Sequence, residues 1–180
     1  SAVHNNVGAR TGASVTFTFS GLDPAVTYRF RAGAVRGTTS FTNRWTRAEL
    51  MGVDSFTSSH TPGALTQAEV PGELVFNQVA LNFGANHTPT TGDLMDWTDI
   101  RCGPDGEFSV VCVRYTGTVP DGNSGPPTAV SYAPTALLLE EFRDAPVAII
   151  AHPASQAIDE GEDRSFEVTA SGRPVFFQLA

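Results

Sequence analysis

The sequence contains no lysine, so its positive charge rests on 11 arginines, which stand against 19 aspartates and glutamates. The net charge of −8 at pH 7 repels the phosphates of nucleic acids and anionic membrane surfaces, so we expect neither as a partner. Without lysine, Schiff-base catalysis and covalent links between subunits through lysine amines are also excluded. A polymer of this chain must therefore be held by noncovalent contacts or joined through other groups.

Long apolar runs and helical periodicity are missing as well. No stretch reaches the roughly 18 apolar residues that span a membrane, so we expect no membrane insertion. Residues 1–13 lack the basic-then-apolar pattern of a signal peptide, which indicates either a signal that was removed or a start within a longer precursor. Charged residues make up only 17% of the chain, so its surface is largely threonine, serine, asparagine and glycine.

Cysteine is scarce, and the two that are present, Cys102 and Cys112, do not define a redox compartment. If the GPDG sequence at residues 103–106 forms a tight hairpin, Cys112 lies ~17 Å further along the ladder than Cys102, too far for a disulfide. A bridge requires the chain to leave the ladder before Cys102. Both arrangements stay open.

Catalytic motifs are absent too. The sequence has no GxSxG elbow, Walker loop, GxGxxG or CxxC. The four histidines have no metal-ligand spacing and are expected on the surface: His4, His60, His87 and His152. Several carboxylates could converge in space, but nothing singles out a pair for glycoside hydrolysis: Glu69, Glu73, Asp93, Asp96 and Asp99. We therefore predict that the chain is not an enzyme.

Period-two alternation of β-branched and aromatic residues is the pattern that the chain does contain. Residues 14–20 (SVTFTFS) and 27–35 alternate clearly and are separated by the turn sequence GLDP, so we predict a first hairpin. Further strands are predicted at residues 44–51, 73–83, 93–100, 107–115 and 130–142. The fold class is therefore all-β, with a jelly-roll-like antiparallel β-sandwich over residues 1–144.

The pattern of residue types changes near residue 144, so we predict that residues 145–180 form a separate segment. The residues that carry a resemblance there are Pro146, Ile149, Pro153, Ser155, Gln156, Glu160, Gly161, Phe166–Gly172, Pro174 and Phe176–Gln178. Their pattern resembles the opening strands of an Ig-like repeat of large secreted bacterial proteins. Residues 14–142 resemble, through TFTFSGLDP…TYRF and RWT…GPDGEFSV, the jelly-roll domains that accompany such repeats. The resemblance implies a bacterial protein located outside the cell or at its surface.

An Ig-like sandwich needs about seven strands, and residues 145–180 supply about three, so this C-terminal arm is incomplete. Its apolar side chains would be exposed: Val147, Ile149, Phe166, Val168, Phe176 and Phe177. Either the precursor continues, or the arm donates its strands to a neighbouring copy of the chain. We favour a structural subunit of an extracellular filament or surface array that assembles head to tail by β-strand donation.

The alternative is a carbohydrate-binding or adhesion module of a large secreted bacterial protein. Trp45, Trp97, Tyr115 and Tyr132 are the candidates for a sugar-stacking platform, flanked by Arg44, Arg47 and Asp96. The competing interpretation is that the two tryptophans are packing residues.

Two further sequence features concern modification and ions. The sequon at Asn86 (Asn-His-Thr) is a candidate glycosylation site. The acidic turns at residues 121–123 and 159–163 are oxygen-rich enough for calcium, although such turns without ions are commoner, so we expect no cofactor.

Overall fold

The computed structural model describes residues 2–4, 14–34, 42–84, 93–120, 122, 132–142, 148–151, 160–161, 165, 167 and 169–171. The chain divides into two compact units, Ser1–Glu141 and Phe142–Ala180. All elements of regular structure within the described ranges are strands, which confirms the all-β prediction. None of the described residues belongs to a helix that could cross a membrane.

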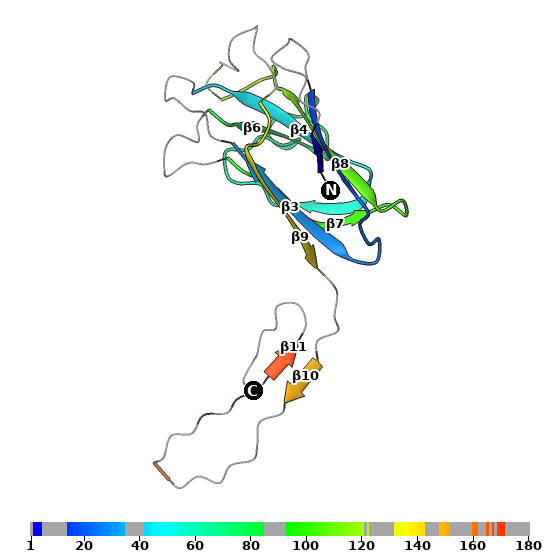
Figure 1. Cartoon of the computed structure of the whole chain (residues 1–180). Coiled ribbons are helices and arrows are strands. Elements are labelled where there is room, and N and C mark those ends of the chain that lie inside the picture. The colour runs from blue at the N-terminus through cyan, green and yellow to red at the C-terminus, as the bar shows by residue number, and fades with distance from the viewer. Residues whose placement is uncertain are drawn as a thin grey trace. The chain divides into compact units, whose positions relative to one another are not determined.

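The first unit is a two-layer β-sandwich (Figure 1). One layer is a five-stranded sheet in the order β1 (Ala2–His4), β2 (Ser14–Ser20), β8 (Glu107–Arg114), β4 (Trp45–Met51) and β6 (Gln78–Asn82). The other is a four-stranded sheet in the order β5 (Val53–Ser58), β7 (Met95–Cys102), β3 (Thr27–Gly33) and β9 (Ala136–Phe142). The β1–β2, β2–β8, β4–β8, β4–β6, β3–β7 and β5–β7 pairs are antiparallel.

From β2 to β9, each strand lies in the sheet opposite to the strand before it. The predicted hairpin between residues 14–20 and 27–35 is therefore wrong, because β2 pairs with β8 and β3 pairs with β7. The turn at residues 103–106 likewise crosses between the sheets instead of closing a hairpin, because it joins β7 to β8. Alternation along a strand identifies the side that faces the core, but it does not identify the neighbouring strand.

The main core fills the space between the two sheets. Among its largest side chains, Phe30, Phe83, Trp97 and Phe108 are almost completely excluded from solvent. Burial of each such side chain stabilises the fold by ~1.5–3 kcal/mol. Cys102 and Cys112 are part of this core, and both are free thiols, so no disulfide joins them.

A smaller second core lies on the outer side of the five-stranded sheet. It consists of Trp45, Leu65, Val70, Leu74, Ala80, Tyr115 and Val119. The neighbouring positions on β6, Val79 and Leu81, belong to the main core, so Ala80 faces the other way. The segment preceding β6 covers this second core and is not strand, so the predicted strand at 73–83 is reduced to Gln78–Asn82.

The carboxylate of Glu73 holds the segment before β6 in place over the second core. It accepts hydrogen bonds from the Tyr115 hydroxyl at 2.7 Å, from the Thr118 amide at 2.7 Å and from the Thr118 hydroxyl at 2.6 Å. These three bonds hold the pKa of Glu73 below its usual value. Glu73 therefore has a structural task, which is to tie the segment before β6 to the chain that follows β8.

A β-bulge in the middle of β7 sets the inward face of the four-stranded sheet. The register shifts against β3 and against β5 around Thr98 and Asp99. Asp99 has φ +52°, which is the left-handed region. The extra residue lets Trp97 and Ile100 both face the core, although three positions separate them.

The second unit contains two short antiparallel strands, β10 (Ala148–Ala151) and β11 (Thr169–Ser171). Ile149 on β10 is 51% exposed and its neighbour Ile150 is 66% exposed. The other arm residues singled out from the sequence lie outside the described residues: Val147, Phe166, Val168, Phe176 and Phe177.

Candidate functional site

The four aromatic residues of the predicted sugar-stacking platform are all buried. Trp97 (0% exposed) and Tyr132 (9%) belong to the main core, and Trp45 (4%) and Tyr115 (5%) belong to the second core. A sugar ring needs an open aromatic face, so the burial favours the interpretation that these side chains serve packing. The indole N–H groups of Trp45 and Trp97 have no acceptor among the described residues.

The polar residues expected beside that platform are also held in structural contacts. Asp96 accepts two hydrogen bonds from the Arg29 guanidinium, at 2.9 Å from Nε and 2.6 Å from Nη2. The guanidinium carbon of Arg44 lies 5.8 Å from the centre of the Tyr132 ring, in cation–π geometry. Arg47 approaches Glu49 at 3.9 Å.

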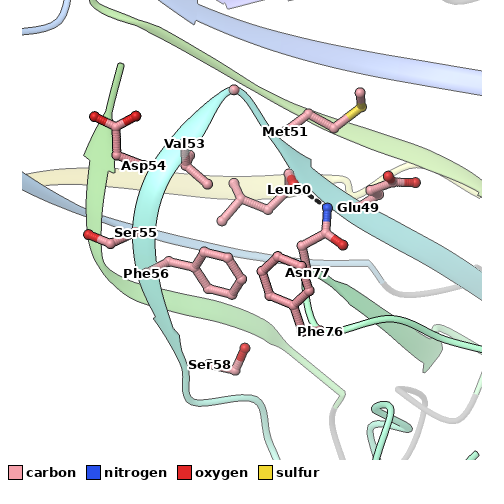
Figure 2. A pocket seen from close by; sticks show the side chains of 11 residues that line it. Glu49, Leu50, Met51, Val53, Asp54, Ser55, Phe56, Ser58, Phe76 and Asn77 are labelled. Carbon is pink, nitrogen blue, oxygen red and sulfur yellow. Dashed lines mark hydrogen bonds between the residues drawn. The ribbon is translucent and has the colours of Figure 1, made fainter. Parts of the chain in front are cut away.

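An open pocket of about 560 Å³ lies where β4 turns into β5 (Figure 2). It is formed by residues 49–56 and 58 of these two strands, together with Phe76 and Asn77 from the turn before β6. The β4–β5 turn depends on Gly52, whose φ of +74° is unfavourable for any residue with a β-carbon. The pocket is therefore built on two rigid strands and a tight turn.

Two phenylalanines provide the apolar surface of this pocket. The rings of Phe56 and Phe76 are 5.6 Å apart between centroids, with 13° between their planes. Phe56 packs against the main core, whereas Phe76 is 71% exposed. Figure 2 shows the two rings side by side, with the side chain of Met51 directed away from them. An exposed phenylalanine supported from one side in this way offers its other face to a ligand.

The turn that carries Phe76 is held firmly against β4. The amide of Leu50 donates to the Asn77 carbonyl at 2.9 Å, and the Asn77 side-chain nitrogen donates to the Leu50 carbonyl at 2.8 Å. Gln78 closes the turn by donating its backbone N–H to the Val75 carbonyl at 2.9 Å. The backbone that carries Phe76 is therefore held in place before any ligand arrives, which reduces the entropy cost of binding.

Hydrogen-bonding groups surround the phenylalanine pair. Glu49, Asp54, Ser55, Ser58 and Asn77 line the pocket. Glu49 accepts a hydrogen bond from the Gln78 side chain at 2.9 Å. Among the described residues that line this pocket there is no arginine or histidine, so the carboxylates of Glu49 and Asp54 set its charge. The arrangement suits an uncharged ligand that donates hydrogen bonds, and it disfavours anions.

A second pocket, of about 530 Å³, lies beside His60 and is lined by residues 58–66, Glu69 and Pro120. The Nδ1 of His60 accepts the Asp96 amide hydrogen at 3.0 Å, and its ring meets the Trp97 indole edge-on with 5.1 Å between centroids. The surface interpretation of this histidine is wrong, because the side chain is half-buried and its Nε2 is shielded from solvent. Burial lowers the pKa of His60 to about 4.

The carboxylates considered for catalysis are tied to different partners. Glu69 accepts hydrogen bonds from the Thr66 amide and hydroxyl, which lower its pKa. Asp93 accepts the Asn82 amide hydrogen at 2.8 Å, and burial raises its pKa. With Asp96 bound to Arg29 and Glu73 bound to Tyr115 and Thr118, no catalytic pair stands out among these residues.

Metal and glycan candidates receive little support from the described residues. In this part of the chain, no group of three or more histidine, cysteine, aspartate or glutamate side chains could hold a metal ion. Asn86, His87 and His152 lie outside the described residues, as do most residues of the two acidic turns. The prediction of glycosylation at Asn86 therefore stays a prediction.

Sequence reasoning missed the Phe56–Phe76 pair for two reasons. The predicted strand at 73–83 includes Phe76, and an alternating aromatic in a strand is expected to face the core. Pro71, Gly72 and Asn77 are turn-forming residues and were the available signal for an irregular segment. Phe56 belongs to a strand, β5, whose sequence VDSFTS has too few apolar residues to predict.

The fold and the site define an all-β protein with an antiparallel two-sheet sandwich and an exposed aromatic pocket at one strand turn. Comparisons of the chain with protein-family models, with curated proteins and with solved structures found no match.

Proposed function

We propose that this chain is a noncatalytic glycan-binding module, and that the pocket at the β4–β5 turn is its binding site. The observation that carries the proposal is the Phe76 ring, which is 71% exposed, stacked on Phe56 and carried on a turn that hydrogen bonds hold to β4. A solvent-exposed phenylalanine adds little to folding, so its rigid support points to a binding role.

The chemistry of the pocket fits a sugar ring. One face of a pyranose carries C–H groups with partial positive charge, and these pack on the negative face of an aromatic ring. Hydroxyl groups at the rim of the sugar can then donate to the carboxylate of Asp54 and to the side-chain oxygen of Asn77. The hydroxyls of Ser55 and Ser58 can donate or accept.

Glycan binding is tested by affinity electrophoresis and titration calorimetry against a panel of neutral and acidic polysaccharides. We expect the wild-type chain to bind at least one neutral polysaccharide, and Phe76→Ala to weaken that binding at least tenfold. Val75→Ala is the matched control, because Val75 is exposed beside Phe76 but does not line the pocket. A wild-type chain that binds no member of the panel, or a Phe76→Ala variant with unchanged affinity, contradicts the proposal.

A second candidate function is assembly through the C-terminal arm, as a subunit of an extracellular filament or surface array. It is favoured by the exposure of Ile149 and Ile150 on β10, which forms a two-stranded sheet with β11 within the described ranges. A two-stranded sheet is marginally stable alone, and pairing with a neighbouring copy would cover its apolar residues.

Assembly is tested by electron microscopy and sedimentation of the whole chain. We expect concentration-dependent oligomers or filaments, and their loss in Ile150→Asp. Thr169→Asp, an exposed position on β11, is the control for added charge. A wild-type chain that stays monomeric at every concentration argues against this function.

We also infer the finer fold from the strand order. The order β2-β8-β4-β6 facing β5-β7-β3, with successive strands in opposite sheets, supports jelly-roll connectivity. An incomplete Ig-like arm and a location outside a bacterial cell rest on the sequence resemblance of residues 145–180.

A further inference from the structure

We propose that the glycan site continues across the Met51–Gly52 turn into a second depression, so that it binds an internal stretch of an extended, uncharged glycan chain. This inference rests on the proposed glycan-binding function and adds the shape and charge of the ligand.

The second depression has a volume of about 290 Å³ and shares Met51 and Gly52 with the phenylalanine pocket. Thr16 of β2 and Ser109 of β8 also line it. Both residues are flanked along their strands by core side chains, so they face outward from the five-stranded sheet. Ser109 lies directly opposite Met51 in the β4–β8 ladder. The two depressions are therefore neighbours on either side of the end of β4.

Met51 forms the wall between the two depressions. It is 47% exposed, and Figure 2 shows its side chain directed away from the Phe56–Phe76 pair. An unbranched thioether adapts its shape to the surface that covers it. A chain whose first sugar stacks on Phe76 can therefore continue over Met51 toward Ser109 without crossing a rigid barrier.

The polar groups of both depressions disfavour an anionic ligand and suit one that is rich in hydrogen-bond donors, such as an uncharged glycan. The second depression supplies the hydroxyls of Thr16 and Ser109 and the carboxylates of Asp105 and Glu107. Within the described part of the chain, neither depression is lined by arginine or histidine. Two like charges 4 Å apart repel by about 1 kcal/mol in water, so uronate or sulfate groups along the chain are disfavoured. Sugar hydroxyls, in contrast, can donate to the carboxylates.

A length series of neutral oligosaccharides tests the inference. Titration calorimetry with the neutral glycan bound by the wild-type chain is compared for the di-, tetra- and hexasaccharide. We expect the hexasaccharide to bind at least tenfold more tightly than the disaccharide. Thr16→Trp, which fills the second depression, should remove this gain and leave the disaccharide affinity unchanged. Val113→Trp, at an outward position of β8 outside both depressions, should bind like the wild type.

The outcomes separate this inference from the proposed function. Equal affinities for short and long oligosaccharides, abolished together by Phe76→Ala, overturn the extended site while the glycan-binding function stands. A length gain that survives Thr16→Trp also overturns it. Tighter binding of a polyuronate, or displacement of the glycan by a cationic peptide, overturns the ligand class. Absence of all glycan binding contradicts the proposed function itself.

Discussion

The ring of Phe76 lies nearly parallel to the ring of Phe56, at 5.6 Å between centroids and 13° between planes, yet only one of the two is packed against the core. Phe56 supports the Phe76 ring from the side of the core, and Phe76 exposes its ring to solvent. The tryptophans differ from this pair, because Trp97 is buried in the main core and Trp45 in the second core.

The first prediction concerns the stability effects of these aromatic residues. Phe76→Ala should change the free energy of unfolding by no more than ~0.5 kcal/mol, because the side chain is 71% exposed. Trp97→Ala should cost ~3–5 kcal/mol, because it opens a cavity in the main core. Urea denaturation of both variants measures the difference. A large loss of stability in Phe76→Ala would assign that ring to packing instead of binding.

The second prediction compares two ion pairs on the four-stranded sheet. Arg29 binds Asp96 with two hydrogen bonds, and the Asp96 side chain is only 10% exposed. Arg29→Ala should therefore cost ~1–2 kcal/mol, since it strips a shielded carboxylate of its partner. Arg31 and Glu140 are 36% and 35% exposed, so Arg31→Ala should cost less than ~1 kcal/mol. Equal losses in urea denaturation would refute this ranking.

The third prediction is a loss of stability in mild acid that originates at His60. Its pKa falls from 6.5 in the unfolded chain to about 4 in the folded protein. The unfolded chain therefore binds the proton first, and the stability that neutral His60 contributes is complete above pH 6.5 and declines as the pH falls toward 4. The two pKa values correspond to a loss of ~3 kcal/mol.

His60→Asn provides the comparison for this pH dependence. The asparagine oxygen can accept the Asp96 amide hydrogen, as Nδ1 does in the wild type, but it does not titrate in this range. Unfolding free energies measured from pH 7 to pH 4.5 should fall less in the variant than in the wild type. Carboxylates such as Asp93 contribute equally to both proteins, so they cancel in the difference. Parallel profiles would show that His60 is not the source.

The fourth prediction concerns the two thiols. Cys102 and Cys112 are buried and unbridged, and burial raises the pKa of Cys112 to about 12. Both should resist a thiol reagent in the native state and react fully in urea without any reductant. Quantitative labelling under the two conditions measures this protection. Rapid labelling of the native chain would indicate an opening of the sandwich, and no labelling in urea would indicate a disulfide.

The sequence predicted strand positions better than strand partners. The alternation of Val15, Phe17 and Phe19 located β2 and its buried face, because side-chain periodicity reports which side is covered. It could not show that β2 pairs with β8, since that partner lies far along the chain. The expected hairpin failed for this reason.

The candidate site was harder to predict than the fold. The sugar platform was predicted at tryptophan and tyrosine residues because of their side-chain chemistry. A sequence does not show which large aromatic residues are buried. Phe76 became recognisable only when the turn that exposes it and the support from Phe56 were known. Assembly through the arm stays a prediction, since Ile149 is the one member of that set with a described side chain.

From β2 to β9, consecutive strands lie in opposite sheets, and this arrangement affects how the protein folds. The β2–β8 ladder joins residues that are far apart in the sequence, for example Thr18 and Ser109, which are 91 positions apart. No adjacent pair of these strands can nucleate a ladder, so loop closure must precede most of the stabilising contacts, and folding should take milliseconds to seconds. The central ladder cannot close during synthesis until β8 has left the ribosome, and until then the apolar faces of the earlier strands depend on chaperones or rapid collapse for protection.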